Sequence, residues 1–268
     1  MTMSLKKISN NLRFSIIKMS NETKAPHLAS SLSCIDIVST LYHSVLNVNK
    51  KNFKSILRNR FILSKGHAAA ALYVALEYKK IISKRELSSY TKKGSLLEEH
   101  PSPKMSGVEA ATGSLGHELS IGCGIALSSK INKQKFMTYV LMSDGECNEG
   151  SVWEAALFAS AKKLNNLCAF VDYNKWQATG KSKEILKLGS LTKKFYQFGW
   201  NVLEIDGHNH DLIYKACKVA IKEKSKPTIV IANTIKGKGI SFMEDDNNWH
   251  YRIPSNKEVK LAKKELKI

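Results

Sequence analysis

Apolar segments of strand length alternate with amphipathic segments of helix length through the second half of this 268-residue chain. Four short segments are rich in aliphatic and β-branched residues, and three segments between them carry apolar residues at helical spacing. The expected strands are 137–142, 167–171, 201–205 and 228–232, and the expected helices are 151–163, 191–198 and 210–224. Strands separated by helices form βαβ units, which give a parallel sheet covered on both faces. We therefore predict an α/β fold, a doubly wound and mostly parallel sheet flanked by helices, in a single domain over residues 1–268.

The first half of the chain shows helical periodicity and no strand pattern. The expected helices are 5–20, 33–46, 66–80 and 118–130, and a short basic helix is expected at 256–266. No repeat, low-complexity linker or proline-rich hinge divides the chain. Since 43% of the residues are hydrophobic, the chain is able to bury one large core.

The formal net charge of +19 raises the question of an anionic partner. The lysines are scattered along the chain, and only five of the 42 basic residues are arginine, the residue that reads bases and phosphates through its planar fork. A solvated lysine-rich surface is the favoured interpretation, and neither nucleic acid nor a membrane is an expected partner. The charge is also suited to holding an acidic partner chain or to attracting phosphorylated substrates.

The five cysteines are far apart and form no CxxC pair, which is typical of a reducing compartment rather than of disulfides or zinc. The first 18 residues lack the continuous apolar core of a secretory signal, and no apolar run reaches the ~20 residues of a membrane span. A cytoplasmic location is expected.

Polar residues follow two of the predicted strands. Asp144 and Gly145 come after the first strand of the second half, and Asn174 follows the next strand 30 residues later. Ligands of open α/β sheets bind at the carboxyl ends of the strands, where these side chains would meet. Mg²⁺ prefers oxygen ligands and is commonly shared with phosphates. Asp144 alone could be an ordinary turn or helix cap, but the spaced pair predicts a site for a metal and a diphosphate.

Residues 142–180 resemble the thiamine-diphosphate motif as transketolases carry it. Further segments resemble transketolases in family order, so that the resemblance covers about residues 27–254: these are 58–67, 100–101, 107–116, 234–239 and 249–250. The resemblance implies a thiamine-diphosphate-binding fold and an enzyme that transfers a two-carbon ketol unit between sugars. In such enzymes the cofactor carries the carbanion chemistry and the protein positions it.

Residue by residue, the resemblance implies three sets of roles. The Mg²⁺ ligands (Ca²⁺ or Mn²⁺ could replace it) would be Asp144, Asn174 and the backbone oxygen of Trp176. Residues contacting the cofactor would be His67, Gly113, Leu115, Asp144, Gly145, Glu149, Asn174 and His250. The catalytic residues, acting on substrate hydroxyls, would be His27, His67, His100 and His250. Imidazole titrates near neutral pH and so can accept and donate those protons.

Several positions depart from the family pattern and bear on the substrate. Ser143 stands where glycine is usual, Pro26 precedes His27 in an altered segment, and Glu118 and Tyr251 also replace common glycines. Glu149 and Glu154 resemble acidic residues between two active sites, although an exposed charge is an alternative for Glu154. Three other histidines have no family support and are interpreted as ordinary helix or loop residues: His43, His208 and His210.

The resemblance also implies a partner. Transketolases bind the pyrimidine of the cofactor with a following domain that carries the activating glutamate, and this sequence ends where that domain would begin. The expected partner is a separate C-terminal, pyrimidine-side subunit in an α₂β₂ heterotetramer acting on sugars or sugar phosphates. Two alternatives stay open: a carboligation in the biosynthesis of an unusual sugar, and a non-catalytic scaffold homologue.

Overall fold

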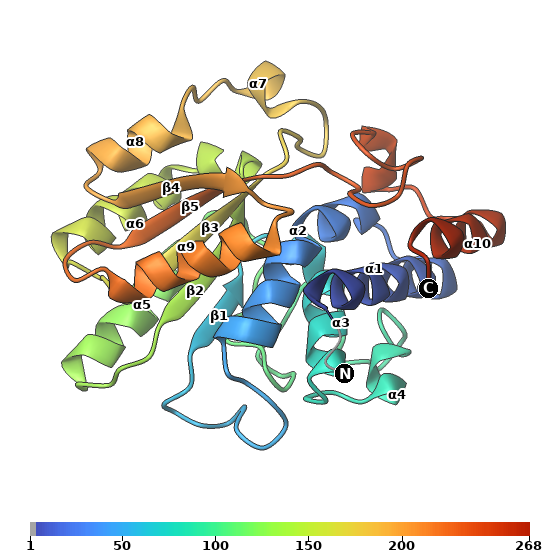
Figure 1. Ribbon diagram of the computed structural model, residues 1–268, viewed down its shortest axis with the longest axis horizontal. Helices are drawn as coiled ribbons and strands as arrows, with labels where there is room; N and C mark the ends of the chain where they lie inside the picture. The colour runs from blue at the N-terminus through green and yellow to red at the C-terminus, as the bar shows by residue number, and fades with distance from the viewer. Residues whose placement is uncertain (1–3) are drawn as a thin grey trace.

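A wholly parallel five-stranded sheet lies at the centre of the computed structural model, which describes residues 4–268 (Figure 1). The strand order is β1-β2-β3-β5-β4. The strands are β1 (Arg60–Leu63), β2 (Thr138–Ser143), β3 (Leu167–Tyr173), β4 (Asn201–Asp206) and β5 (Thr228–Asn233). The predicted α/β fold is confirmed. Residues 1–3 of the predicted domain and of the N-terminal segment lie outside the described residues.

Successive side chains of the central strands enter two separate cores, because a strand points its side chains to alternate faces. Tyr139 and Phe170 belong to one core, and Val140 and Val171 belong to the other. One face is covered by α1 (Leu5–Thr23), α2 (Leu28–Thr40), α3 (Ala69–Tyr78) and α9 (His210–Lys222), and the other by α5 (Glu118–Ile131), α6 (Gly150–Ala161) and α8 (Leu191–Gln197). Helix α10 (Asn256–Glu265) packs on α1.

Most predicted elements are found within a few residues of their expected bounds, but the first half contains a strand that was not expected. Strand β1 is four residues long and pairs in parallel with β2, from Arg60 opposite Thr138 to Leu63 opposite Leu141. Four residues are too few to show alternation, so the pattern gave no signal. The sequence-based prediction of an all-helical first half is wrong at this point.

Helix α2 begins at Leu28, five residues before the predicted start at residue 33, and is followed by a π-helical turn at Leu41–Val45. Its early turns contain several serines, which weaken the apolar pattern, yet every residue of α2 is buried. Short elements escaped prediction because each spans only four residues: α4 (Lys84–Leu87), α7 (Ser182–Ile185), and 3-10 turns at Gly145–Asn148 and Asn247–His250. A further 3-10 turn at Gly66–Ala68 forms the start of the helix predicted at 66–80.

Two expectations from composition agree with the structure. All five cysteines are buried and unpaired. From residue 4 onward, no helix combines the length and the apolarity that crossing a membrane requires.

Candidate functional site

The carboxyl ends of β2 and β3 bring the predicted metal ligands to one edge of the sheet. The two strands are parallel neighbours, with Ser143 opposite Asp172. Asp144 directly follows β2, and Asn174 directly follows β3. The structure therefore places both residues at adjacent strand ends, as the spacing predicted.

Asp144 has an oxygen that lacks a partner. Its side chain is buried; Oδ2 accepts a hydrogen bond from the Ser182 hydroxyl at 2.7 Å, whereas Oδ1 is buried and accepts none. Burial raises the pKa of Asp144 to about 6. A buried carboxylate oxygen without a donor is costly, and a bound cation would relieve the cost.

The neighbouring amide oxygen of Asn174 accepts a hydrogen bond from the backbone N–H of Trp176 at 3.0 Å. Its amide nitrogen donates to Asp172 at 3.2 Å, so the amide nitrogen faces Asp172 and the amide oxygen points away from it. Asp172 is fully buried and forms an ion pair with Lys65. No three His, Cys, Asp or Glu side chains of residues 4–268 gather into a metal-ligand set. A metal here would therefore depend on amide and main-chain oxygens beside the single carboxylate, a hard oxygen set that suits Mg²⁺.

Glycines let other segments pack closely around this edge. Gly113 has φ +126°, and a Cβ there would lie 2.6 Å from Cδ2 of His100. At Gly145 a Cβ would lie 2.8 Å from Cγ of Gln177, whose buried side-chain nitrogen has no hydrogen-bond partner. Gly116 packs against Glu149 in the same way. This edge thus presents an unsatisfied donor as well as an unsatisfied acceptor, which fits an anion bound together with a cation.

The predicted histidines converge on one cluster. The ring of His27 lies 4.9 Å from that of His250 and 5.7 Å from that of His67, and the rings of His67 and His250 are 5.9 Å apart. His100 lies against Gly113 and is close enough to His27 to act on its charge. All four histidines are brought together by segments that are distant in sequence.

Burial favours the neutral form of His67 and His250. It lowers the pKa of His67 well below the ordinary value, with Lys65 adding to the effect. The pKa of His250 is lowered to about 3 by burial and then by Lys236, whose ammonium donates to Nδ1 of His250 at 3.0 Å. Neutral imidazoles can accept protons from hydroxyl groups at neutral pH.

Lys236 was not singled out from the sequence, although residues 234–239 were. Its ammonium is buried among the site residues and also contacts Asn247. Burial, followed by Lys65, lowers its pKa to about 8. A buried lysine beside such a site is a signal for an anionic ligand, but burial cannot be read from the sequence, so sequence reasoning missed it.

The remaining predicted residues are placed less centrally. Leu115 is half-buried in the loop after Gly113. Glu149 is exposed and packs on Gly116, while Glu154 is exposed on α6. Trp176 has its indole N–H donating to Asp245 at 2.6 Å.

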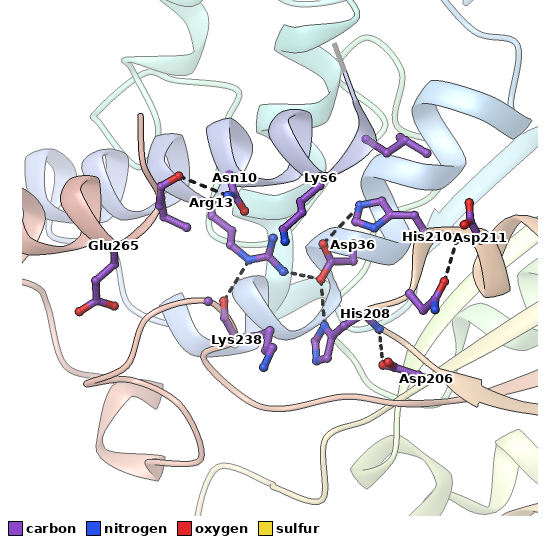
Figure 2. A pocket seen from close by; sticks show the side chains of 14 residues that line it. Lys6, Asn10, Arg13, Asp36, Asp206, His208, His210, Asp211, Lys238 and Glu265 are labelled. Atoms are coloured by element: carbon purple, nitrogen blue, oxygen red, sulfur yellow. Dashed lines mark hydrogen bonds and ion pairs between the residues drawn. The ribbon is translucent and has the colours of Figure 1, made fainter.

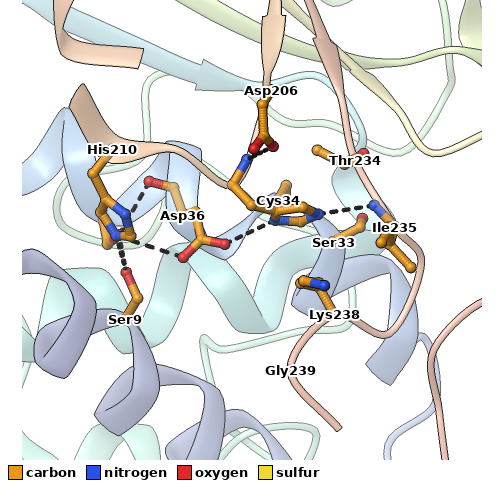
Figure 3. A network of polar contacts seen from close by, with 12 residues as sticks. Ser9, Ser33, Cys34, Asp36, Asp206, His210, Thr234, Ile235, Lys238 and Gly239 are labelled. Atoms are coloured by element: carbon orange, nitrogen blue, oxygen red, sulfur yellow. Dashed lines mark hydrogen bonds and ion pairs between the residues drawn. The ribbon is translucent and has the colours of Figure 1, made fainter. Parts of the chain in front are cut away.

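His208 lies in a turn and His210 begins α9, as predicted, and both also take part in a network of polar contacts. Asp36 of α2 accepts from Arg13 of α1 and lies 2.9 Å from Nδ1 of His208 (Figure 2). Nε2 of His208 in turn accepts the backbone N–H of Ile235 at 2.9 Å (Figure 3). The network borders a cavity of about 690 Å³.

The same network includes His210, whose Nε2 lies 2.7 Å from the Ser9 hydroxyl. Arg13 Nε donates to the carbonyl of Lys238 at 3.0 Å, and the backbone N–H of Gly237 donates to the carbonyl of Ala29. Both contacts, with the one at Ile235, fix the segment that carries Lys236. Since the partners come from distant parts of the chain, no local motif could reveal them.

Comparison with known proteins decides the family. Residues 4–268 match the family model described as "Transketolase, thiamine diphosphate binding domain". The chain belongs to the transketolase family.

Two relatives are each named as one of the subunits of an apulose-4-phosphate transketolase. The one from Phocaeicola vulgatus is 37% identical, with 99% of this chain and 94% of that protein covered. The one from Actinobacillus succinogenes is 40% identical, with 98% and 96% covered. The solved transketolase from Campylobacter jejuni superposes with a TM-score of 0.93 at 29% identity; it covers all of this chain, which spans 43% of that transketolase.

Proposed function

We propose that this chain is the diphosphate-side subunit of a two-chain transketolase that moves a ketol unit from a ketose to an aldehyde acceptor in the cytoplasm. The observation that carries the proposal is the convergence of the unpartnered Asp144 oxygen, Asn174 and the four histidines at one sheet edge. Two relatives of nearly the same length are named as single subunits of transketolases, which supports a separate partner chain.

The residues at the sheet edge fit a metal bound to a diphosphate. Oδ1 of Asp144, the amide oxygen of Asn174 and the carbonyl of Trp176 would hold Mg²⁺, and the Lys236 ammonium would balance diphosphate charge. When bound, thiamine diphosphate supplies an electron sink for the carbanion left by cleavage of a carbon–carbon bond.

The histidine cluster supplies the proton transfers. Because burial lowers the pKa values of His67 and His250, both are neutral at pH 7 and can donate and accept hydrogen bonds with hydroxyl groups of the sugar. The loop at Gly113 holds His100 against the same space. These side chains orient a polyhydroxylated substrate without adding charge to the site.

The outer face of α6 supports an α₂β₂ assembly. Leu157 is 61% exposed and Phe158 is 40% exposed next to the exposed carboxylate of Glu154. Adjacent exposed apolar side chains mark interaction surfaces. Light scattering on the co-purified chains would give the mass of the assembly.

The test is reconstitution with a candidate pyrimidine-side subunit encoded in the same genome. Each chain alone and the mixture are assayed with thiamine diphosphate, Mg²⁺ and a panel of ketose phosphates that includes apulose 4-phosphate, the compound in the names of two relatives. We expect ketol transfer only with both chains, the cofactor and a divalent cation. Full activity of this chain alone would overturn the two-chain assignment, and inactivity of the cofactor-loaded complex on every ketose would overturn the reaction.

A further inference from the structure

A carboxylate outside the predicted site contacts one of its histidines. Nδ1 of His27 lies 3.2 Å from Oε1 of Glu99. Both atoms are buried, and neither makes a hydrogen bond of ordinary geometry to any described residue, so this close contact is what each has. The His27 side chain is 15% exposed and that of Glu99 38% exposed, so the pair sits where the site opens to solvent.

The backbone at His27 is held in an uncommon conformation that fixes where the ring can go. His27 has φ +63° and lies directly before α2. A non-glycine residue in the left-handed region is strained, and such strain tends to persist at functional positions. Its N–H donates to the carbonyl of His250 at 2.7 Å, and its carbonyl accepts from the N–H of Ser31 at 3.2 Å. These contacts direct the imidazole toward the rings of His67 and His250.

We propose that Glu99 is a positioning residue that makes His27 the base for a substrate hydroxyl. The carboxylate holds the proton on Nδ1, which leaves Nε2 as the acceptor. Among residues 4–268 no side chain makes a hydrogen bond of ordinary geometry to the His27 ring, and Glu99 is the carboxylate that approaches it. A carboxylate on one ring nitrogen fixes the tautomer and the orientation and stabilises the imidazolium that forms. The catalytic part of this inference rests on the proposed function.

The proton step balances within the pair. The O–H bond of a sugar hydroxyl breaks as the N–H bond at Nε2 forms. The oxygen keeps that electron pair and uses it for the new C=O bond as the adjacent carbon–carbon bond breaks, and the electron pair of the carbon–carbon bond would pass to the electron sink that thiamine diphosphate supplies when bound. The positive charge on the imidazole then lies beside the Glu99 carboxylate. The reverse transfer returns the proton to an alkoxide of the product sugar, and Glu99 stays ionised throughout.

The surroundings of His27 act on its basicity in opposite directions. Burial lowers its pKa, the charge of Glu99 raises it, and His100 and Lys236 lower it. The rings of His67, His250 and Tyr251 complete the surroundings. Glu99 is the nearby group that counteracts the others, so that without it His27 would be a weaker base.

Glu99→Gln tests the pair, because glutamine keeps the size and removes the charge. The control is Glu98→Gln, the same change at the adjacent residue, whose side chain is exposed. The first readout is ¹⁵N NMR of the histidine rings in the full chain during a pH titration. We expect His27 to be protonated on Nδ1 when neutral, to titrate at lower pH in Glu99→Gln, and to be unchanged in Glu98→Gln. A neutral His27 protonated on Nε2, or an unchanged titration in Glu99→Gln, would overturn the inference.

The second readout uses the complex with its partner. We expect kcat/KM of Glu99→Gln to fall about tenfold at its plateau, with the acid limb of the pH profile moved to lower pH, since the weaker base stays unprotonated further down. An active wild type with an unaltered Glu99→Gln profile would refute the catalytic role. An inactive wild type whose NMR shows the pair would refute the proposed function and leave the pair in place.

Discussion

Replacing Asp36 with asparagine tests the network that fixes the Lys236 segment. Asp36 is buried and binds Arg13 and His208. Burial raises the pKa of Asp36, but Arg13 and His208 outweigh it and lower the value to about 2, compared with an ordinary 3.8. At 1.36 kcal/mol per pKa unit, this difference corresponds to about 2 kcal/mol of stability at neutral pH. Asparagine also leaves the Arg13 charge buried without a counter-ion, so the expected loss is about 2–4 kcal/mol.

The pH dependence gives the prediction its sign. Because the folded-state pKa is depressed, the stabilisation is fully present above the ordinary value and is lost as pH falls toward the folded-state value. Between pH 5 and pH 3 the wild type should lose about 1 kcal/mol of this advantage over Asp36→Asn.

Urea unfolding followed by circular dichroism at pH 7, 5 and 3 measures both effects. The control is Glu22→Gln, which breaks the exposed Lys18–Glu22 pair on α1, a type of pair that contributes about 0.3–0.5 kcal/mol. If Asp36→Asn costs no more than this control, or if the gap to wild type is independent of pH, the assigned role of the buried network is wrong.

Two further substitutions, Gly113→Ala and Lys236→Met, test the edge of the sheet at which the cofactor is proposed to bind, and Gly124→Ala is the control. Gly113→Ala places a methyl group against His100 at a backbone conformation that disfavours alanine, and it should weaken thiamine diphosphate binding at least tenfold by calorimetry. Gly124→Ala, on α5 with nothing within 4 Å, should instead raise stability by about 0.5–1 kcal/mol. Lys236→Met keeps an unbranched side chain that is one atom shorter and removes its charge, and it should raise the dissociation constant of thiamine diphosphate about 10- to 100-fold, the worth of a charged hydrogen bond. Binding equal to wild type would remove Lys236 from the diphosphate site.

The sequence was sufficient to predict the second half of the fold, because its strands and helices are long enough to show their periods. The βαβ alternation placed Asp144 and Asn174 at neighbouring strand ends, and the structure has them there. Strand β1, with four residues, carried too little pattern to be detected.

What the sequence could not predict depends on contacts between distant segments. The Asp36–His208 contact spans 172 residues, so His208 was interpreted as an ordinary loop residue. Glu99 was passed over because its role depends on the direction of one side chain toward His27, which no spacing encodes. Lys236 was one of many lysines, and only its burial sets it apart.

The most direct test of the central claim is a thermal-shift titration of this chain with thiamine diphosphate, in Mg²⁺ or in chelator, for wild type and Asp144→Asn. At about 100 times the dissociation constant, binding adds about 2.7 kcal/mol of stability, which is visible as a higher Tm. We predict that the wild type is stabilised only when cofactor and Mg²⁺ are both present. In Asp144→Asn the addition of Mg²⁺ together with the cofactor should give no such stabilisation. No stabilisation of the wild type, or equal stabilisation in chelator, would contradict the claim that this sheet edge binds a metal and a diphosphate together.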